Sequence, residues 1–318
     1  MKIILFTLLF ISKCCQLVSQ DSANIKKHPS ISVLQERTKN DKRVKLVVAA
    51  NIVAYGGTMV ALYSTWYKNY PQSRFHFFND NKEWLQVDKV GHSWSAYTEG
   101  RLSVEMWSWS GLPRNKAIWL GGISGLAYQS AIEILDGFSA EWGFSWGDYL
   151  ANIAGSGMLI GQEFGWKEQR IQLKFSSHRK NYENDFLNKR ADEIYGQGLP
   201  ERILKDYNVQ TYWLSANIKS FFKDSGIPPW LNIAIGYGAE GMFGAVNNKW
   251  VDHSGVSYNR SDIKRYRQFY IAPDIDFTKI KTKSKFLKLG FFILNSIKIP
   301  APSLEFSDNK FTWNWLHF

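Results

Sequence analysis

The sequence predicts an α+β fold, in which a hydrophobic helical bundle is followed by an antiparallel β-sheet. Between residues 44 and 166, long uncharged stretches carry small residues four positions apart, a spacing typical of closely packed helices. After residue 167, apolar and polar residues alternate with a period of two, as in strands that have one apolar face. The chain is 45% hydrophobic and 16% aromatic, which excludes the low-hydrophobicity disordered class.

Residues 1–19 are predicted to be a secretory signal peptide. Lys2 precedes the apolar run Ile3–Ile11, which is too short to cross a bilayer. The chain's two cysteines, Cys14 and Cys15, lie inside this segment, so the mature chain is expected to have no thiol for a disulfide, a nucleophile or a metal site. Residues 20–43 are polar and aperiodic, and we expect an N-terminal arm there.

Three uncharged stretches are predicted to be helices, at residues 46–67, 117–132 and 149–162. The first has 22 residues, enough to cross roughly 30 Å of hydrocarbon. Its polar and small residues, such as Asn51 and Gly56, favour packing against protein on one face; a buried helix of a soluble bundle is the alternative. Gly121 and Gly125 in the second stretch, and Gly157 and Gly161 in the third, are spaced for close contact between helices.

Alternating segments in the second half are predicted to be strands, at residues 169–177, 212–218, 231–243, 268–277, 304–306 and 311–318. The last two are expected to pair as a hairpin around Ser307–Lys310. Aromatic-rich strands with one apolar face are typical of outer-membrane β-barrels, and the terminal Phe318 resembles their C-terminal assembly signal. We therefore expect a sheet tending towards an outer-membrane barrel. Six strands are fewer than the eight of the smallest single-chain barrels, and a soluble antiparallel sheet is the alternative.

The formal net charge of +11 is unevenly distributed. Residues 84–166 contain eight acidic and four basic residues, so the centre of the chain is acidic although the whole is basic. No helix-turn-helix, zinc-finger or RNA-binding motif accompanies the basic residues. We therefore expect a basic surface that faces solvent or lipid headgroups, and no nucleic-acid partner.

The acidic centre carries the densest polar motifs. Six polar residues occur at helical pair spacings on otherwise apolar segments: Asp88, His92, Glu133, Asp136, Asp148 and Asn152. Ser145 is expected to cap the helix that contains Asp148. Because isolated charges are costly against lipid or a dry core, the six are predicted to converge and satisfy one another.

Two hypotheses account for this cluster. In the first, it is a structural polar cluster that fixes helix register. In the second, His92 with Asp88, Glu133 and Asp148 performs acid–base chemistry or binds a divalent metal. A single histidine is thin support for a metal site, and no nucleophile elbow, His-Glu-x-x-His motif or phosphate-binding loop is present. We favour the structural hypothesis and expect no cofactor and no metal.

The same residues carry a family resemblance. The motifs are Asp88-Lys89-x-Gly91-His92, Tyr97, Glu133-x-x-Asp136-Gly137 and Phe144-Ser145-x-x-Asp148-x-x-x-Asn152-x-x-Gly155. They resemble the YfiM-like family of predicted periplasmic proteins (domain of unknown function 2279), in the long form of Bacteroidota, and are distantly similar to VanZ-like membrane proteins. The resemblance implies an envelope location and a helical core, and brings no established reaction. Unlike the short lipoprotein members, the chain has Ser12-Lys13 before Cys14, which makes a poor lipidation site.

These observations predict an exported protein of the outer membrane, exposed to the periplasm, with 44–166 as a helical domain and 167–318 as a β domain. The expected function is that of a non-enzymatic accessory or scaffold protein, with outer-membrane lipid and other envelope proteins as partners. One alternative is an envelope hydrolase or transferase that acts on lipid or peptidoglycan precursors through His92 and its neighbouring carboxylates. The other is a small-molecule channel or binding protein.

Overall fold

The computed structural model describes residues 39–67, 71–178, 180–252 and 254–318. The predicted signal peptide, most of the predicted arm and both cysteines lie outside the described residues. The chain forms two compact units. The helical unit comprises the described residues up to 78 together with 95–169 and 278–293, and the sheet unit comprises 79–94, 170–277 and 294–318. Each unit is therefore assembled from separate stretches of the chain.

The helical unit is built on four long helices: α2 (Asp41–Leu62), α3 (Val87–Trp109), α4 (Arg114–Asp136) and α5 (Trp146–Gly165). A π-helical turn (Tyr63–Tyr67) continues α2, and the first two turns of α3 belong to the sheet unit. All three uncharged stretches are helical, as predicted. Ser145 caps α5 by accepting a hydrogen bond from the Asp148 backbone N–H at 3.1 Å, which confirms the predicted cap.

Glycines bring α4 close to α3. A Cβ atom on Gly125 would lie 2.3 Å from the Ala96 carbonyl oxygen, and one on Gly121 would lie 2.4 Å from the Val104 backbone nitrogen. The predicted packing role of these two glycines is thus confirmed. The same prediction is wrong for Gly157 and Gly161 of α5, because a Cβ atom on either would meet nothing within 4 Å.

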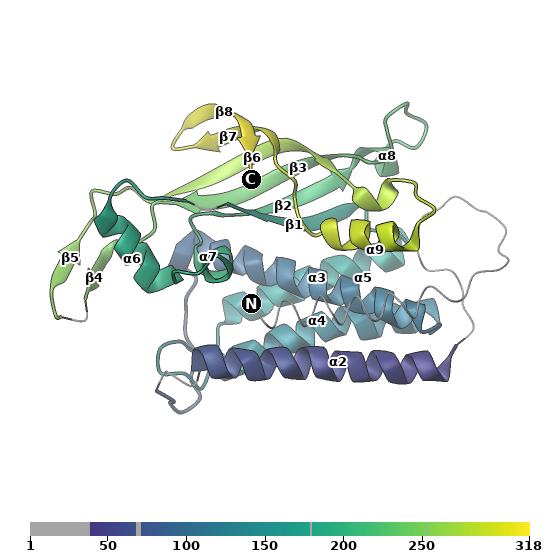
Figure 1. Ribbon diagram of the computed structural model, residues 1–318, viewed down its shortest axis with the longest axis horizontal. Helices are drawn as coiled ribbons and strands as arrows, with labels where there is room; N and C mark the ends of the chain where they lie inside the picture. The colour runs from purple at the N-terminus through teal and green to yellow at the C-terminus, as the bar shows by residue number, and fades with distance from the viewer. Residues whose placement is uncertain (1–38, 68–70, 179, 253) are drawn as a thin grey trace. The chain divides into compact units, whose positions relative to one another are not determined.

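The sheet unit is built on six antiparallel strands in the order β1 (Ile171–Ser177), β2 (Gln210–Asn217), β3 (Leu231–Glu240), β6 (Tyr266–Ile275), β7 (Ala301–Ser307) and β8 (Lys310–His317). Figure 1 shows these strands side by side. β4 (Lys249–Val251) and β5 (Ser257–Asn259) form a separate hairpin. Over the part of the chain that the structure describes, β1 and β8 are the edges of an open sheet.

The predicted C-terminal hairpin is present, and its turn has a local cause. Asp308 and Asn309 both have positive φ angles, 47° and 59°. Two left-handed residues make a two-residue turn whose twist matches that of the flanking strands, and aspartate and asparagine tolerate this conformation.

Short helices in the second half are absent from the sequence prediction: α6 (Asp185–Tyr195), α7 (Leu199–Lys205), α8 (Ile218–Phe221), α9 (Lys285–Leu294) and the 3₁₀ turn Phe277–Lys279. The basic residue Lys285 begins α9, an amphipathic helix. Its Phe292 ring lies 4.9 Å from the Arg101 guanidinium of α3.

In β3 and β6, the sheet buries the face that carries small and polar residues and exposes the face that carries the aliphatic residues. In β3 the buried residues include Asn232 and Ala234, whereas Ile233 and Ile235 are exposed. β6 follows the same rule, with Tyr270, Ala272 and Asp274 buried and Phe269 and Ile271 exposed. Paired strands keep the faces aligned, because Ala234 pairs with Ala272 and Ile235 pairs with Ile271. The alternation was predicted; the structure adds that the polar face is the inner one.

We expect Gly125→Ala to destabilise the helical unit by about 1–3 kcal/mol or more, because the new methyl group must push α4 away from the backbone of α3. Gly157→Ala is the matched control, another mid-helix glycine with open space around it. It should be neutral or stabilising by up to about 1 kcal/mol through helix propensity. Thermal melting of the purified variants measures both effects. Equal melting temperatures for the two would contradict the proposed helix contact.

Candidate functional site

The first two of the six predicted residues, Asp88 and His92, lie one turn apart at the start of α3, within the sheet unit. Lys89 lies between two carboxylates, 2.7 Å from Asp80 and 3.0 Å from Asp88. Burial raises the pKa of Asp88, and the Lys89 ammonium opposes that rise. The start of α3 therefore carries a compact group of ion pairs whose side chains are mostly buried.

The turn directly before α3 has a strained backbone. Trp84, Leu85 and Gln86 have φ angles of 46°, 50° and 65°, all in the left-handed region that side chains disfavour. Partners on distant segments hold it: the Trp84 N–H donates to the Ala245 carbonyl at 2.8 Å, and the Tyr237 hydroxyl donates to the Leu85 carbonyl. Strain of about 1–3 kcal/mol per residue persists only when the surroundings fix it in this way.

The other four predicted residues lie in the helical unit, where Glu133 and Asp136 end α4 and Asp148 and Asn152 begin α5. Glu133, Asp148 and Asn152 are buried. Carboxylate oxygens of Glu133 and Asp148 lie within 4.8 Å of each other. The Ser145 backbone N–H donates to Glu133 at 3.3 Å, so the residue that caps α5 also ties it to α4.

Asp136 has a different neighbour, since it accepts a hydrogen bond from the Tyr67 hydroxyl at 2.6 Å. The pairing of Glu133 with Asp148 agrees with the predicted cluster, whereas convergence of all six residues stays a prediction. Phe318 follows directly after β8, and its role as an assembly signal also stays a prediction.

A buried carboxyl group that the predicted cluster omitted lies in the helical unit. Glu99 of α3 accepts a hydrogen bond from the Gln129 side chain of α4 at 2.9 Å, and its second oxygen is buried without a hydrogen bond to a described residue. Burial raises the pKa of Glu99 to about 8, against the smaller opposing effect of Gln129. Burial likewise raises the pKa of Glu105 to about 7, opposed by Arg101. The sequence signal was the helical spacing from Asp88 and His92 to Glu99.

The interior of the sheet holds a fully buried ion pair. Lys174 of β1 and Asp274 of β6 are 2.7 Å apart, and both side chains have zero exposure. The same Asp274 oxygen accepts the Ser215 hydroxyl at 2.6 Å, and the Lys174 ammonium also donates to the Ile275 carbonyl at 2.7 Å. These contacts join β1, β2 and β6 through one carboxylate.

The hydrogen-bond network continues from this pair across the sheet. The Asn232 side chain donates to Ser215 at 2.8 Å, and Asn217 donates to Asn232 at 2.7 Å. Lys298 lies over the Trp213 ring with its ammonium 4.8 Å from the ring centre, and burial lowers the pKa of Lys298, although Asp274 opposes the change. Most polar groups of this network thus supply one another's partners, although the second carboxylate oxygen of Asp274 has no hydrogen bond to a described residue.

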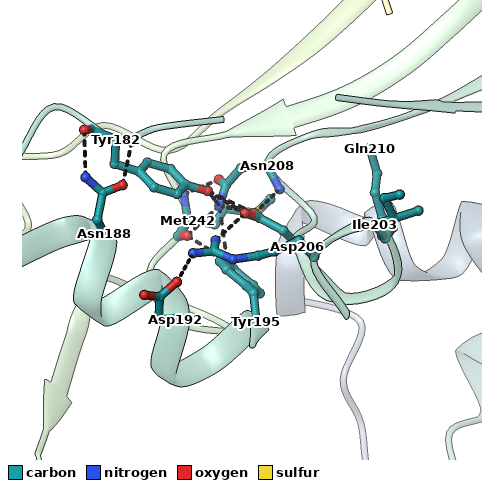
Figure 2. Close-up of polar contacts among 10 residues, drawn as sticks. Tyr182, Asn188, Asp192, Tyr195, Ile203, Asp206, Asn208, Gln210 and Met242 are labelled. Atoms are coloured by element: carbon teal, nitrogen blue, oxygen red, sulfur yellow. Dashed lines mark hydrogen bonds and ion pairs between the residues drawn. The ribbon is translucent and has the colours of Figure 1, made fainter. Parts of the chain in front are cut away.

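A second buried network, shown in Figure 2, ties α6 and α7 to the sheet. Both carboxylate oxygens of Asp206 lie 2.9 Å from the Tyr182 hydroxyl, and the Arg202 guanidinium lies 2.8 Å from Asp206. The Asn208 side chain donates to the Met242 carbonyl at 2.8 Å and accepts from the Met242 N–H at 2.7 Å. Burial and the Asp206 charge both raise the pKa of Tyr182, so this hydroxyl stays a donor. We interpret the network as structural.

Glu99 predicts a pH-dependent stability of defined sign. Its folded pKa of about 8 exceeds the ordinary 4.5, so the folded state binds the extra proton between these values. The stability that Glu99 contributes through this raised pKa is complete below pH 4.5. It is lost as the pH rises towards and through 8. We expect Glu99→Gln to raise the free energy of unfolding by only about 1 kcal/mol at pH 5 and by about 4 kcal/mol at pH 8. Melting curves from pH 5 to 8.5 measure this.

The exposed Glu141 provides the control for that series, because Glu141→Gln changes the same groups at the surface. It should follow the wild-type profile at every pH. A Glu99→Gln profile parallel to that of the wild type would refute the raised pKa.

The buried ion pair predicts a non-additive pair of mutations. Lys174→Met should cost about 3–5 kcal/mol, because Asp274 keeps its charge without its partner. Lys174→Met combined with Asp274→Leu should cost less than Lys174→Met alone, because the buried carboxylate is removed together with its ion-pair partner. Arg260→Met, which breaks the surface pair with Asp262 (2.8 Å), is the control and should cost less than about 1 kcal/mol. Denaturant titration measures all three, and a double variant less stable than Lys174→Met would contradict this account.

Comparison with known proteins gives one match. The model of a family described as predicted periplasmic lipoprotein (DUF2279) matches residues 76–160, about a quarter of the chain. This segment contains all six predicted site residues and supports that part of the resemblance. No curated protein and no solved structure matches the chain significantly. Residues 76–160 are therefore similar to a family of predicted periplasmic lipoproteins whose function is unknown.

Proposed function

We propose that this protein is an exported envelope protein that associates with the outer membrane and acts there as a non-enzymatic accessory or scaffold protein. One observation carries the proposal. A row of apolar side chains crosses five adjacent strands: Leu214, Ile235, Ile271, Leu304 and Trp313. Each is paired with the next, and their exposed fractions run from 38% to 59%.

Such a row needs an apolar partner. Soluble proteins rarely expose contiguous apolar patches of more than a few hundred Å², and larger ones mark membrane or protein contacts. The other face of the sheet holds the fully buried Lys174–Asp274 pair, so the apolar row lies on the face that is left for an apolar partner. Lipid is the occupant that best fits an apolar face over a polar interior.

The edge strand β8 strengthens this choice. Phe311, Trp313 and Trp315 occupy alternate positions and are all exposed, so they lie on one face of the strand. Tryptophan is enriched where proteins meet the membrane–water interface, since its ring is apolar and its N–H is polar. The proposal keeps the predicted tendency towards a barrel, with Phe318 as its assembly signal.

The helical unit has the same inverted distribution. Ile52, Trp119 and Leu150 are exposed on α2, α4 and α5, while Glu133 and Asn152 are buried. Among the described helices, α2 alone is long and apolar enough to cross a membrane by length and composition. It contacts α4 through the Tyr128 hydroxyl, which donates to Thr58 at 2.8 Å. Apolar surfaces on both units favour association with lipid.

The proposal extends to partners and relatives. We propose other envelope proteins as partners, a relationship to the long Bacteroidota-type YfiM-like form, and a distant VanZ-like relationship. Within this proposal, Asp88, His92, Glu133, Asp136, Asp148 and Asn152 act as a structural lock on the helices. The Ser145 cap and its contact with Glu133 support that role, because both bonds fix the position of α5.

Membrane fractionation with charge variants tests the proposal. The wild-type protein should sediment with outer membranes and resist carbonate and high-salt extraction. Ile235→Lys places a charge in the centre of the apolar row and should release a substantial fraction into the soluble periplasm. Val251→Lys is the control, because Val251 is equally exposed (63% against 59% for Ile235) but lies in the separate hairpin.

Recovery of wild-type protein in the soluble periplasmic fraction would refute the membrane association. Equal release of both lysine variants would refute the role of the sheet face. A pull-down in mild detergent tests the scaffold role separately, and recovery of the protein alone would argue against it.

A further inference from the structure

The inner face of the sheet contains a polar pocket that none of the predicted sites includes. Its volume is about 170 Å³, it is partly open, and all of its lining residues belong to the sheet unit. At roughly 15 Å³ per water, it holds on the order of ten water molecules. A ligand of about ten to twelve non-hydrogen atoms fills such a space.

Carboxylate and amide groups dominate the wall. Glu305 of β7 accepts hydrogen bonds from the side chains of Gln268 at 3.1 Å and Asn314 at 3.0 Å. Glu240 of β3 accepts from Gln268 at 3.3 Å and forms an ion pair with Lys180. Four strands thus direct acceptors and amide groups towards one small volume.

Two imidazoles complete the wall. His317 stacks on Tyr270 with ring centres 4.1 Å apart, and its Nε2 lies 3.3 Å from the Thr211 hydroxyl. His178 lies 6.4 Å from His317, and its Nδ1 is buried without a hydrogen bond to any described residue. Burial lowers the pKa of both rings, to about 4 for His317, so both are neutral near pH 7.

The charge of the wall selects the class of ligand. Lys180 is already paired with Glu240, and Glu305 adds a second carboxylate, so the pocket carries no surplus of positive charge for a phosphate or another anion. Leu316 is the one aliphatic side chain in the lining, so the wall does not suit an acyl chain. Carboxylates accept hydrogen bonds, and amides and neutral imidazoles both donate and accept them, as a ligand with several hydroxyl groups requires.

We propose that this pocket binds a neutral polyhydroxylated ligand of monosaccharide size, with Glu305, Gln268 and Asn314 as its principal hydrogen-bonding residues. The ligand's hydroxyl groups donate to Glu305 and accept from the two amides. The proposal adds a binding activity to the accessory role and does not depend on it, because the pocket lies on the inner face and the apolar row on the outer face of the same sheet.

Saturation-transfer NMR on the full mature chain in detergent tests the proposal, with D-glucose and D-galactose as probes. Inorganic phosphate and putrescine represent anionic and cationic ligands. We expect at least one sugar to bind with a Kd of roughly 10 mM or tighter. Glu305→Gln keeps the shape and removes the charge, and should weaken binding about tenfold; Asn314→Ala should weaken it similarly.

Glu193→Gln is the matched control, because Glu193 lies on α6 outside the pocket and should leave sugar binding unchanged. Melting curves establish that each variant is folded. If a pocket variant does not fold, His317→Phe, which keeps the stacking on Tyr270, takes its place. The proposal is overturned if no sugar binds at about 10 mM, or if the pocket variants bind as the wild type does. Binding of phosphate or putrescine without any sugar also overturns it. The assay is done in detergent, so its result is independent of the fractionation experiment.

Discussion

The Lys174–Asp274 ion pair is the constraint on which the sheet unit depends. Two opposite charges with no exposure are stable in a protein only when each has its partner and further hydrogen bonds, and here Ser215 and the Ile275 carbonyl supply them. A sheet that commits one face to such a network has its apolar residues on the other. The exposed apolar row and the polar pocket therefore have the same cause: the polar face of the sheet is the buried one.

The helical unit also buries polar groups and exposes apolar side chains, but close contacts between helices replace strand pairing. Its helices approach through Gly121 and Gly125, and its buried polar groups pair across helices, as Gln129 does with Glu99. Apolar side chains remain on the outside of α2, α4 and α5. Both units thus combine buried polar contacts and close backbone packing with apolar clusters, such as that of Val87, Tyr212 and Met242, and both also expose large apolar side chains.

The sequence predicted local features well and distant ones poorly. Period-two alternation predicted β3 and β6, and the Ser145 cap was predicted because its partner lies three residues away. Alternation alone does not tell which face is buried, since that depends on Lys174 meeting Asp274 a hundred residues later. The residues that line the pocket come from several strands and share no sequence motif, so their spacing in the sequence did not predict the pocket. Of the predicted cluster, the contact between Glu133 and Asp148 joins two helices that follow each other closely in the chain, whereas Tyr67, the partner of Asp136, lies 69 residues away.

The left-handed turn before α3 has a consequence for the order of folding. This conformation is strained at Trp84, Leu85 and Gln86. The groups that hold it are Ala245, Tyr237 and Arg267, the last of which donates to the Gln86 side chain at 2.5 Å. These partners lie more than 150 residues along the chain, and they are brought together only when β3 and β6 pair. Contacts of such long sequence separation form late, since loop closure must come first. The entrance to α3 should thus be among the last parts of the molecule to reach its native conformation, after the sheet that holds it.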